Sequence, residues 1–456
     1  MDKKINRLLH NRVTRFIAMG HYSDVPERNI LLGYLVYAVA GWLLLMLPWA
    51  TKGDILNPVD NLFTAVSAIS TTGLATVDVG TTYTLFGQVV ILLLVQLGGI
   101  GYMTLSSYII FRLTRHAIGY NKQVMSRSIA VPWGMSLRQI VNNVIHFTIV
   151  FEVLGFLVLY PAMIHAGVHL PAWNAAFLSV SSFCTAGLSL FPDSLCSFSD
   201  NVVVNMTVAI LSYVGAMGFI VITDVVNRLR GRIGHVTFTT KVIVMITGVM
   251  TIGGMTMLML TPDVWSGESF GDRLLASFFQ TMSAMTTVGY NSVQLGILPV
   301  STVLVLSLIM FVGASPSGTG GGVKCTSVSV VWGYVFSKLG LREDVTFLGN
   351  RIPSYRVDTA LTNVIVYGLF ILLGCMALSF SDPLLSLSQI MFEATSALGT
   401  VGLSMDVTHN LSTAGKLIII SLMYIGRVGV ISFGSAFVMR TKRKNLSSKR
   451  EADLAA

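Results

Sequence analysis

The stretch FFQTMSAMTTVGYNSV, residues 278–293, contains a spacing that recurs along the chain. Within it, Phe279, Ser283, Thr287 and Gly289 form the pattern F-x-x-x-S-x-x-x-T-x-G. The same pattern occurs three more times in the 456 residues, at 63–73, 177–187 and 392–402. Internal self-similarity of this kind is typical of repeat architectures, so we interpret the chain as four related units.

Each copy of the pattern predicts a short helix followed by a non-helical segment. Phe, Ser and Thr stand four residues apart, and positions at that spacing share one face of an α-helix. The predicted helix has about ten residues, too few to cross a bilayer. Irregular backbone at membrane depth is tolerated only where it is buried in protein or lines a watery cavity. We therefore expect the tetrapeptides TTGL, TAGL, TVGY and TVGL to line a central pore.

The composition places these units in a lipid bilayer. Hydrophobic residues make up 53% of the chain and charged residues 11%, with a mean hydropathy of +0.72. A soluble domain carries about 25% charged residues. Apolar segments of about 20 residues, the length of a spanning helix, begin near Asn29, Phe86, Val141, Asn201, Lys241, Ser301, Asp358 and Ala414. The sequence thus predicts an all-α polytopic membrane protein with eight spanning helices.

The net charge of +9 is distributed in a way that indicates membrane topology rather than nucleic-acid binding. Of the 30 Lys and Arg residues, 25 fall before the first span, in alternate loops or after the last span. Such asymmetry follows the positive-inside rule, which places both termini in the cytoplasm. The expected organisation is a basic arm (1–28), four units (29–115, 116–235, 236–345 and 346–440) and a cytoplasmic tail (441–456).

The T-x-G segments have residue types that suit ion coordination by the backbone. Glycine reaches dihedrals closed to other residues, so successive carbonyl groups can turn inward, while threonine adds a hydroxyl. Residues 287–290 also match the first four letters of the potassium-filter sequence TVGYG, although Asn291 replaces the second glycine. The predicted ion-binding residues are Thr71, Thr72, Gly73, Thr185, Ala186, Gly187, Thr287, Val288, Gly289, Thr400, Val401 and Gly402.

The sixth span contains a break. Its segment FVGASPSGTGGGVKCTSVSVV, residues 311–331, combines glycines with a proline, the poorest helix formers. The other inner spans have shorter counterparts at Gly98, Gly215 and Gly426, and the four sites fall 24 to 28 residues after their T-x-G glycines. We expect them to meet just below the pore loops.

Two cations, Lys324 and Arg427, lie at membrane depth, where charges are by default functional or paired. A positive charge below a cation filter raises the barrier to passage. The predicted gate comprises Gly313, Ser315, Pro316, Gly318, Gly320, Gly321, Gly322, Lys324 and Arg427. A structural ion pair of Arg427 with Glu152, Asp224 or Glu393 is the alternative.

With its four filter motifs, the interrupted sixth span and YIGRVG in the eighth, the chain resembles the Trk/Ktr/HKT superfamily of potassium transporters from about Asn29 to Arg440. The resemblance implies a pseudo-fourfold pore in which Gly73, Gly187, Gly289 and Gly402 bind potassium. All four are glycine, as in potassium-selective members. It also implies that the broken sixth span crosses the pore.

The resemblance further implies partners and a location. Trk-type subunits carry two extra N-terminal spans, which this chain lacks, so it looks like the pore subunit of the smaller Ktr kind. That kind is a homodimer in the bacterial inner membrane, resting on a cytoplasmic ring of nucleotide-binding, KtrA-like regulatory subunits. The chain itself shows no such domain and no organic cofactor. Sodium dependence is left open.

Other side chains allow two interpretations. Asp78, Asp193 and Asp406 follow filter glycines by four to six residues, so they either concentrate cations or cap external loops. His165 and His169 form either a weak metal pair or, as we expect, an ordinary surface pair.

We predict that the chain is not an enzyme, because it shows no nucleophile constellation, metal cluster or paired catalytic carboxylates. The alternative functions are an alternating-access carrier for an organic solute and an accessory scaffold. A carrier predicts inverted or two-part symmetry, whereas the repeats here run in one sense.

Overall fold

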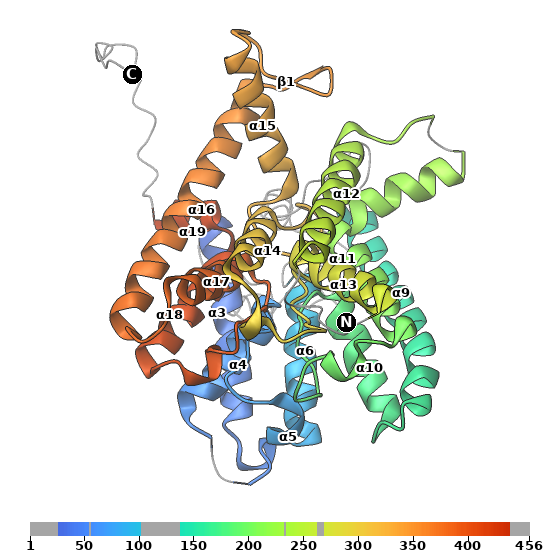
Figure 1. Ribbon diagram of the computed structural model, residues 1–456, viewed down its shortest axis with the longest axis vertical. Helices are drawn as coiled ribbons and strands as arrows, with labels where there is room; N and C mark the ends of the chain where they lie inside the picture. The colour runs from blue at the N-terminus through green and yellow to red at the C-terminus, as the bar shows by residue number, and fades with distance from the viewer. Residues whose placement is uncertain (1–25, 54–55, 102–136, 232–233, 262–268, 438–456) are drawn as a thin grey trace, which may run out of the picture.

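The computed structural model describes residues 26–53, 56–101, 137–231, 234–261 and 269–437, which form a bundle of helices (Figure 1). The helices that correspond to the predicted spans are α3 (Pro26–Leu45), α6 (Leu85–Ile100), α9 (Leu137–His165), α11 (Val202–Leu229), α12 (Phe238–Met259), α14 (Val300–Val312), α15 (Cys325–Leu339), α16 (Ser354–Ser381), α18 (Thr413–Val428) and α19 (Val430–Phe437). Four further helices, called the short helices below, lead to the T-x-G segments, namely α4 (Pro58–Ser70), α10 (Pro171–Phe183), α13 (Phe270–Thr286) and α17 (Leu387–Gly399).

The remaining elements are small and lie toward the two ends of the molecule (Figure 1). The turn α5 (Val79–Thr82) lies at one end, and strand β1 (Thr346–Phe347), paired antiparallel with β2 (Asn350–Arg351), lies at the other. Single 3₁₀ turns are Pro48–Ala50, Cys196–Phe198, Leu295–Ile297 and Thr408–Asn410.

Each of the eight predicted spans corresponds to a helix or a pair of helices. Among the described residues, five helices are long and apolar enough to cross a membrane, and a sixth span is obtained if α18 and α19 count as one. The helices α6 and α14 are shorter apolar helices. The break in the sixth span is confirmed, since α14 ends at Val312 and α15 begins at Cys325.

The eighth span consists of two helices joined at a sharp bend. α18 and α19 are bent by 95° at Gly429, whose φ is 89°. A residue with this φ cannot continue a right-handed helix, and glycine adopts it without a steric penalty. The remainder of the second span, after Gly101, falls in residues 102–136, outside the described residues.

The four short helices share one mode of packing. Each contacts the inner helix of the preceding unit, as in α10 against α6, α13 against α11, and α17 against α14. The first of them, α4, contacts α18, which is the inner helix of the last unit. The arrangement is therefore a closed ring. The phenylalanines of the four motifs, Phe63, Phe177, Phe279 and Phe392, are buried.

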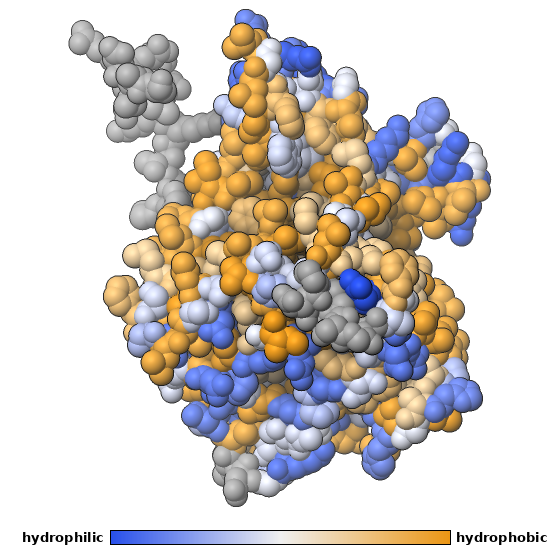
Figure 2. All heavy atoms as spheres, viewed as in Figure 1, coloured by the Kyte–Doolittle hydropathy of each residue, from blue (hydrophilic) through white to orange (hydrophobic). Residues whose placement is uncertain are grey.

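The outward faces of the long helices are apolar. Large exposed hydrophobic side chains line α16, including Leu372, Leu373 and Phe380. Figure 2 shows hydrophobic residues over much of the flank of the molecule, whereas hydrophilic residues gather toward the end that holds α5 and toward the opposite end, which holds β1. An exposed apolar surface of this extent suits contact with lipid. The chain is a multi-pass membrane protein.

Candidate functional site

The four T-x-G segments have the same local geometry. Thr71, Thr287 and Thr400 are the C-caps of α4, α13 and α17, and Thr185 follows the end of α10 by two residues. All four threonines adopt the left-handed conformation, at φ values of 51°, 50°, 58° and 47° for Thr71, Thr185, Thr287 and Thr400. The glycine two residues later has a φ of 94° at Gly73, 62° at Gly187, 85° at Gly289 and 97° at Gly402. Positive φ at the glycine turns the backbone sharply, a conformation that side chains disfavour.

These glycines lie side by side in a closed ring. A methyl group added to Gly73 would collide with the carbonyl oxygen of Ala186, and one added to Gly187 would collide with that of Val288. The series continues from Gly289 to the carbonyl of Val401 and from Gly402 back to that of Thr72. Only glycine allows such a close approach of backbone. The structure thus brings the twelve predicted filter residues together around one axis.

The serine of the motif anchors the loop in the first, second and fourth units, in different ways, whereas the buried Ser283 Oγ of the third unit has no hydrogen-bond partner among the described residues. The backbone N–H groups of Gly73 and Gly402 donate to Ser67 Oγ and Ser396 Oγ, each at 3.1 Å. In the second unit, Ser181 Oγ instead donates to the carbonyl of Leu188 at 2.9 Å. The ring is therefore fourfold in backbone path but unequal in its supporting hydrogen bonds.

Tyr290 joins two units directly. Its hydroxyl, fully buried, donates to the Leu188 carbonyl at 3.1 Å. A buried phenol needs such a partner, because an unsatisfied hydroxyl is costly in a protein interior. The bond spans 102 residues of sequence and fixes the third loop against the second.

A cavity lies on each side of the ring. The outer one, about 180 Å³, is lined by all four glycines together with polar groups that include Asp78, Asp406 and Asn291. The inner one, about 350 Å³, is lined by residues 316–322, Lys324 and Arg427. The ring of loops separates these two cavities.

The segment between α14 and α15 crosses beneath the ring and bonds first to the second unit. The N–H of Ser315 donates to the Ala216 carbonyl at 3.2 Å, and that of Thr319 donates to the Gly215 carbonyl at 3.0 Å. Thr185 Oγ1 donates to Thr319 Oγ1 at 3.0 Å, so the segment also contacts the threonine of the second T-x-G loop. We call residues 313–324 the crossing loop.

The crossing loop also contacts the third and fourth units. Gly321 N donates to Thr287 Oγ1 at 2.8 Å. Gly322 N donates to the carbonyl of Gly399 at 3.1 Å. The loop thus contacts three units, the third and fourth through backbone N–H groups and the second through backbone N–H groups and the Thr319 hydroxyl.

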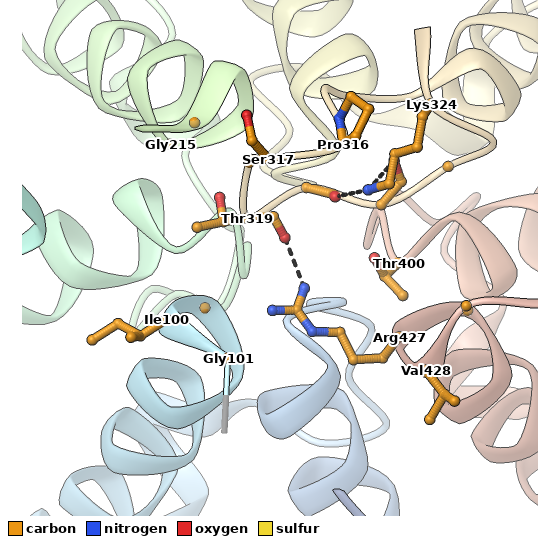
Figure 3. A pocket seen from close by; sticks show the side chains of 18 of the residues that line it. Ile100, Gly101, Gly215, Pro316, Ser317, Thr319, Lys324, Thr400, Arg427 and Val428 are labelled. Atoms are coloured by element: carbon orange, nitrogen blue, oxygen red, sulfur yellow. Dashed lines mark hydrogen bonds between the residues drawn. The ribbon is translucent and has the colours of Figure 1, made fainter. Parts of the chain in front are cut away.

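Arg427 completes the contacts toward the first unit (Figure 3). Its Nη1 lies 2.7 Å from the Thr319 carbonyl and 2.8 Å from Thr71 Oγ1, and its Nη2 donates to the Gly98 carbonyl. Five donors in a planar fork allow one guanidinium to serve several carbonyls at once. Arg427 therefore links the crossing loop to the first unit.

The expected alternative, an ion pair of Arg427, is wrong for the part of the chain that the structure describes. Glu152 lies near the Cys184 thiol, and Asp224 accepts from Thr237 and Thr240. Glu393 accepts from residues after the fourth loop. None of the three pairs with the guanidinium.

Lys324 bonds within the crossing loop itself. Its Nζ donates to the carbonyls of Gly320 at 2.5 Å and Gly321 at 3.3 Å (Figure 3). Its backbone has a φ of 82°, unusual for a residue with a side chain. The ammonium therefore curls the loop back on the start of α15.

The outer acids fall into two groups. Asp78 and Asp406 line the outer cavity, so a role in attracting cations stays open for them. Asp78 also caps the turn α5 through Gly80 N at 2.9 Å. Asp193 accepts from the backbone and hydroxyl of Ser197 and does not line that cavity.

The two histidines do not form a metal centre with a third ligand. His165 ends α9 and His169 lies in the loop that follows. Among the described residues, no group of three His, Cys, Asp or Glu side chains is placed to hold a metal ion.

Sequence reasoning missed that each of the four inner helices ends or breaks at a glycine with positive φ. Gly101, Gly313 and Gly429 directly follow the last residues of α6, α14 and α18, and Gly218 is a non-helical residue inside α11. All four glycines have positive φ. The signal was present, because LGGIG, VGAMG and IGRVG each contain a second glycine three residues after the predicted one.

Comparison with known proteins places this geometry in a family. The model of the TrkH family, described as cation transport protein, matches residues 36–449. The chain belongs to the TrkH family of cation transport proteins. TrkH-family members are transporters, so the prediction that the chain is not an enzyme is confirmed.

Relatives within the TrkH family agree with the Ktr kind expected from the sequence. The Ktr system potassium uptake protein B of Bacillus subtilis is 34% identical over 430 residues, covering 92% of this chain and 94% of the relative. The protein of the same name from Vibrio alginolyticus is 33% identical over 422 residues, covering 89% and 90%.

A solved structure shows the same fold. The crystal structure of the potassium transporter TrkH from Vibrio parahaemolyticus matches with a TM-score of 0.69 at 18% identity, over 92% of this chain and 86% of that one. The prediction of an all-α polytopic fold is thus confirmed.

Proposed function

We propose that this chain takes up potassium ions across the bacterial inner membrane through the ring of four T-x-G loops. The observation that carries the proposal is the cyclic approach of Gly73, Gly187, Gly289 and Gly402, each against the carbonyl of the next loop. Backbone carbonyls gathered around one axis replace the hydration shell of potassium. Relatives named potassium uptake proteins support the choice of ion.

The gate in this proposal is the crossing loop together with Arg427. The loop lies between the ring and the inner cavity, and Arg427 adds a positive charge at the same level. A cation leaving the filter then meets both a steric and an electrostatic barrier. Opening requires the loop to break its backbone hydrogen bonds to carbonyl groups of the second and fourth units. These hydrogen bonds are of ordinary strength.

The proposal includes assembly and orientation. Ktr relatives are named as parts of a system, which supports a separate regulatory subunit. We infer a homodimer of this KtrB-like chain on a cytoplasmic, KtrA-like nucleotide-binding ring, with both termini in the cytoplasm. The four units 29–115, 116–235, 236–345 and 346–440 are the proposed domains. Transport assays with and without sodium will show whether sodium is coupled to potassium uptake or only competes with potassium.

Potassium uptake by a strain that lacks its own uptake systems tests the pore. Gly289→Ser adds a side chain at a φ of 85°, against the Val401 carbonyl. We expect it to lose potassium affinity or selectivity against sodium. Gly368→Ser is the control, since a Cβ there meets no atom within 4 Å. If Gly289→Ser and Gly368→Ser transport potassium equally well, a carrier with its binding site elsewhere is favoured. If the wild-type chain transports no potassium, a scaffold without transport activity is favoured.

A further inference from the structure

A buried carboxyl group lies behind the fourth loop. Glu393 follows the motif residue Phe392 in α17 and has 0% of its surface exposed. Its Oε1 accepts from Ser404 Oγ and from the backbone N–H of Met405 at 3.3 Å. Its Oε2 accepts from Thr408 Oγ1 at 3.0 Å. Both carboxyl oxygens are thus occupied by donors from a single segment, residues 404–408.

That segment is part of the ion path in the proposed function. Ser404, Asp406 and Thr408 line the outer cavity with the four filter glycines. Ser404 and Thr408 also contact each other, their hydroxyl oxygens lying 2.9 Å apart. Glu393 therefore connects the rigid helix α17 to the wall of the outer cavity without lining it.

The other three units lack this connection. The residues that follow the motif phenylalanine are Thr64, Leu178 and Gln280. Thr64 Oγ1 donates to a carbonyl of its own helix, that of Asp60, at 3.0 Å. Leucine has no acceptor, and neither amide atom of the buried Gln280 has a hydrogen-bond partner. In the described chain, a carboxyl group ties the short helix to the outer segment in the fourth unit alone.

We propose that Glu393 is a positioning residue that sets the cation affinity and selectivity of the outer end of the pore by fixing residues 404–408. The inference rests on the proposed function, since it assumes that ions pass the four loops. Hydrogen bonds to a buried carboxyl are strong and cooperative, and a site binds selectively only when its supporting groups are held rigidly. Without Glu393, residues 404–408 would lose three donor contacts to α17 at once.

Transport kinetics distinguish positioning from mere structural support. We expect Glu393→Ala to raise the apparent KM for potassium about tenfold, and to weaken discrimination against sodium. Maximal uptake per folded molecule should stay within about twofold of wild type. Glu393→Gln keeps one acceptor oxygen and should show a smaller shift of KM. Glu343→Gln, which alters an exposed acid near the β1 end, is the control.

Two further readouts make the test specific. Ser404→Ala should raise KM in the same direction, and adding it to Glu393→Ala should cause little further change, because both remove the same contact. The potassium concentration that gives half-maximal thermal stabilisation of the purified protein should rise with KM.

The outcomes separate the two proposals. A wild-type chain that transports no potassium refutes the proposed function. Wild-type transport with unchanged KM and selectivity in folded Glu393→Ala refutes the present inference alone, as does a change confined to maximal uptake. If Glu393→Ala does not reach the membrane, the KM and selectivity of Glu393→Gln test the inference instead. If neither variant reaches the membrane, the same two measurements on Ser404→Ala test it.

Discussion

Lys416 Nζ lies 2.7 Å from Asp60 Oδ1 and joins the start of α18 to the first turn of α4. The two side chains are only 16% and 13% exposed. The pair lies where the last unit meets the first, so it closes the ring of short helices on its outer side.

Removing the ion pair of Asp60 with Lys416 should weaken the contact between α4 and α18 that closes the ring. A largely buried charge that loses its partner is destabilising, so Lys416→Met and Asp60→Asn should each lower the thermal unfolding midpoint of the purified protein. The double variant should lose less stability than the two single variants together, which corresponds to a coupling energy of about 1–3 kcal/mol. The exposed pair of Arg351 with Asp344, at 2.8 Å, is the control and should show almost no coupling. Additive losses at Asp60 and Lys416 would mean that the contact contributes nothing of its own.

Removing the charge below the ring should open the path. Arg427→Ala deletes a cation and its contacts to Thr71, Thr319 and Gly98. We expect maximal potassium flux to rise about tenfold, equivalent to a barrier lowered by about 1.4 kcal/mol, with selectivity retained. Isotope uptake in cells measures both. Deleting the crossing loop should act in the same direction, and Arg356→Ala, on the exposed start of α16, should leave flux unchanged. Lower or unchanged flux in both gate variants would exclude this gate.

Gly218 tests whether the interrupted inner helices support the crossing loop. It has a φ of 73°, and a Cβ there would collide with the backbone of Ser317. Gly218→Ala should push the loop away and increase potassium leak, at a stability cost of roughly 1–3 kcal/mol from backbone strain. Flux and thermal midpoint are measured together. Gly253→Ala in α12 is the control, because a Cβ there meets no atom within 4 Å. It should neither raise the potassium flux nor lower the thermal midpoint. A silent Gly218→Ala would show that the loop tolerates displacement.

Tyr290 tests the coupling between neighbouring loops. Tyr290→Phe removes one hydrogen bond and leaves the Leu188 carbonyl with Ser181 as its partner. One neutral hydrogen bond contributes about 1 kcal/mol, so sodium should compete about fivefold better for potassium uptake. The exposed Tyr160→Phe in α9 is the matched control. If sodium competes with potassium equally well in folded Tyr290→Phe and in the wild type, the Tyr290 hydroxyl has no role in ion selectivity.

Much of the architecture was predictable because it depends on local patterns. A spacing of four residues marks a helical face, and length separates a spanning helix from a short one. The fourfold recurrence of F-x-x-x-S-x-x-x-T-x-G therefore predicted the four short helices, and the glycines of residues 313–322 predicted the break in the sixth span.

The remaining features depend on contacts between distant segments. Arg427 binds backbone carbonyls, which every residue has, so no sequence signal named Thr319 or Gly98 as its partners. The bend at Gly429 follows from a positive φ, which hydropathy does not record. Glu393 was considered only as a partner of Arg427, whereas its carboxyl faces residues 404–408.

The closure of the ring has a consequence for biogenesis. Asp60 and Lys416 are 356 residues apart in sequence, as are Thr71 and Arg427. At a synthesis rate of about 5–20 residues per second, the first short helix leaves the ribosome roughly 20–70 s before its last neighbour. During that interval its polar T-x-G end lies in the membrane without a complete ring around it. We therefore expect an open, three-sided intermediate during synthesis, which closes only when α18 reaches α4.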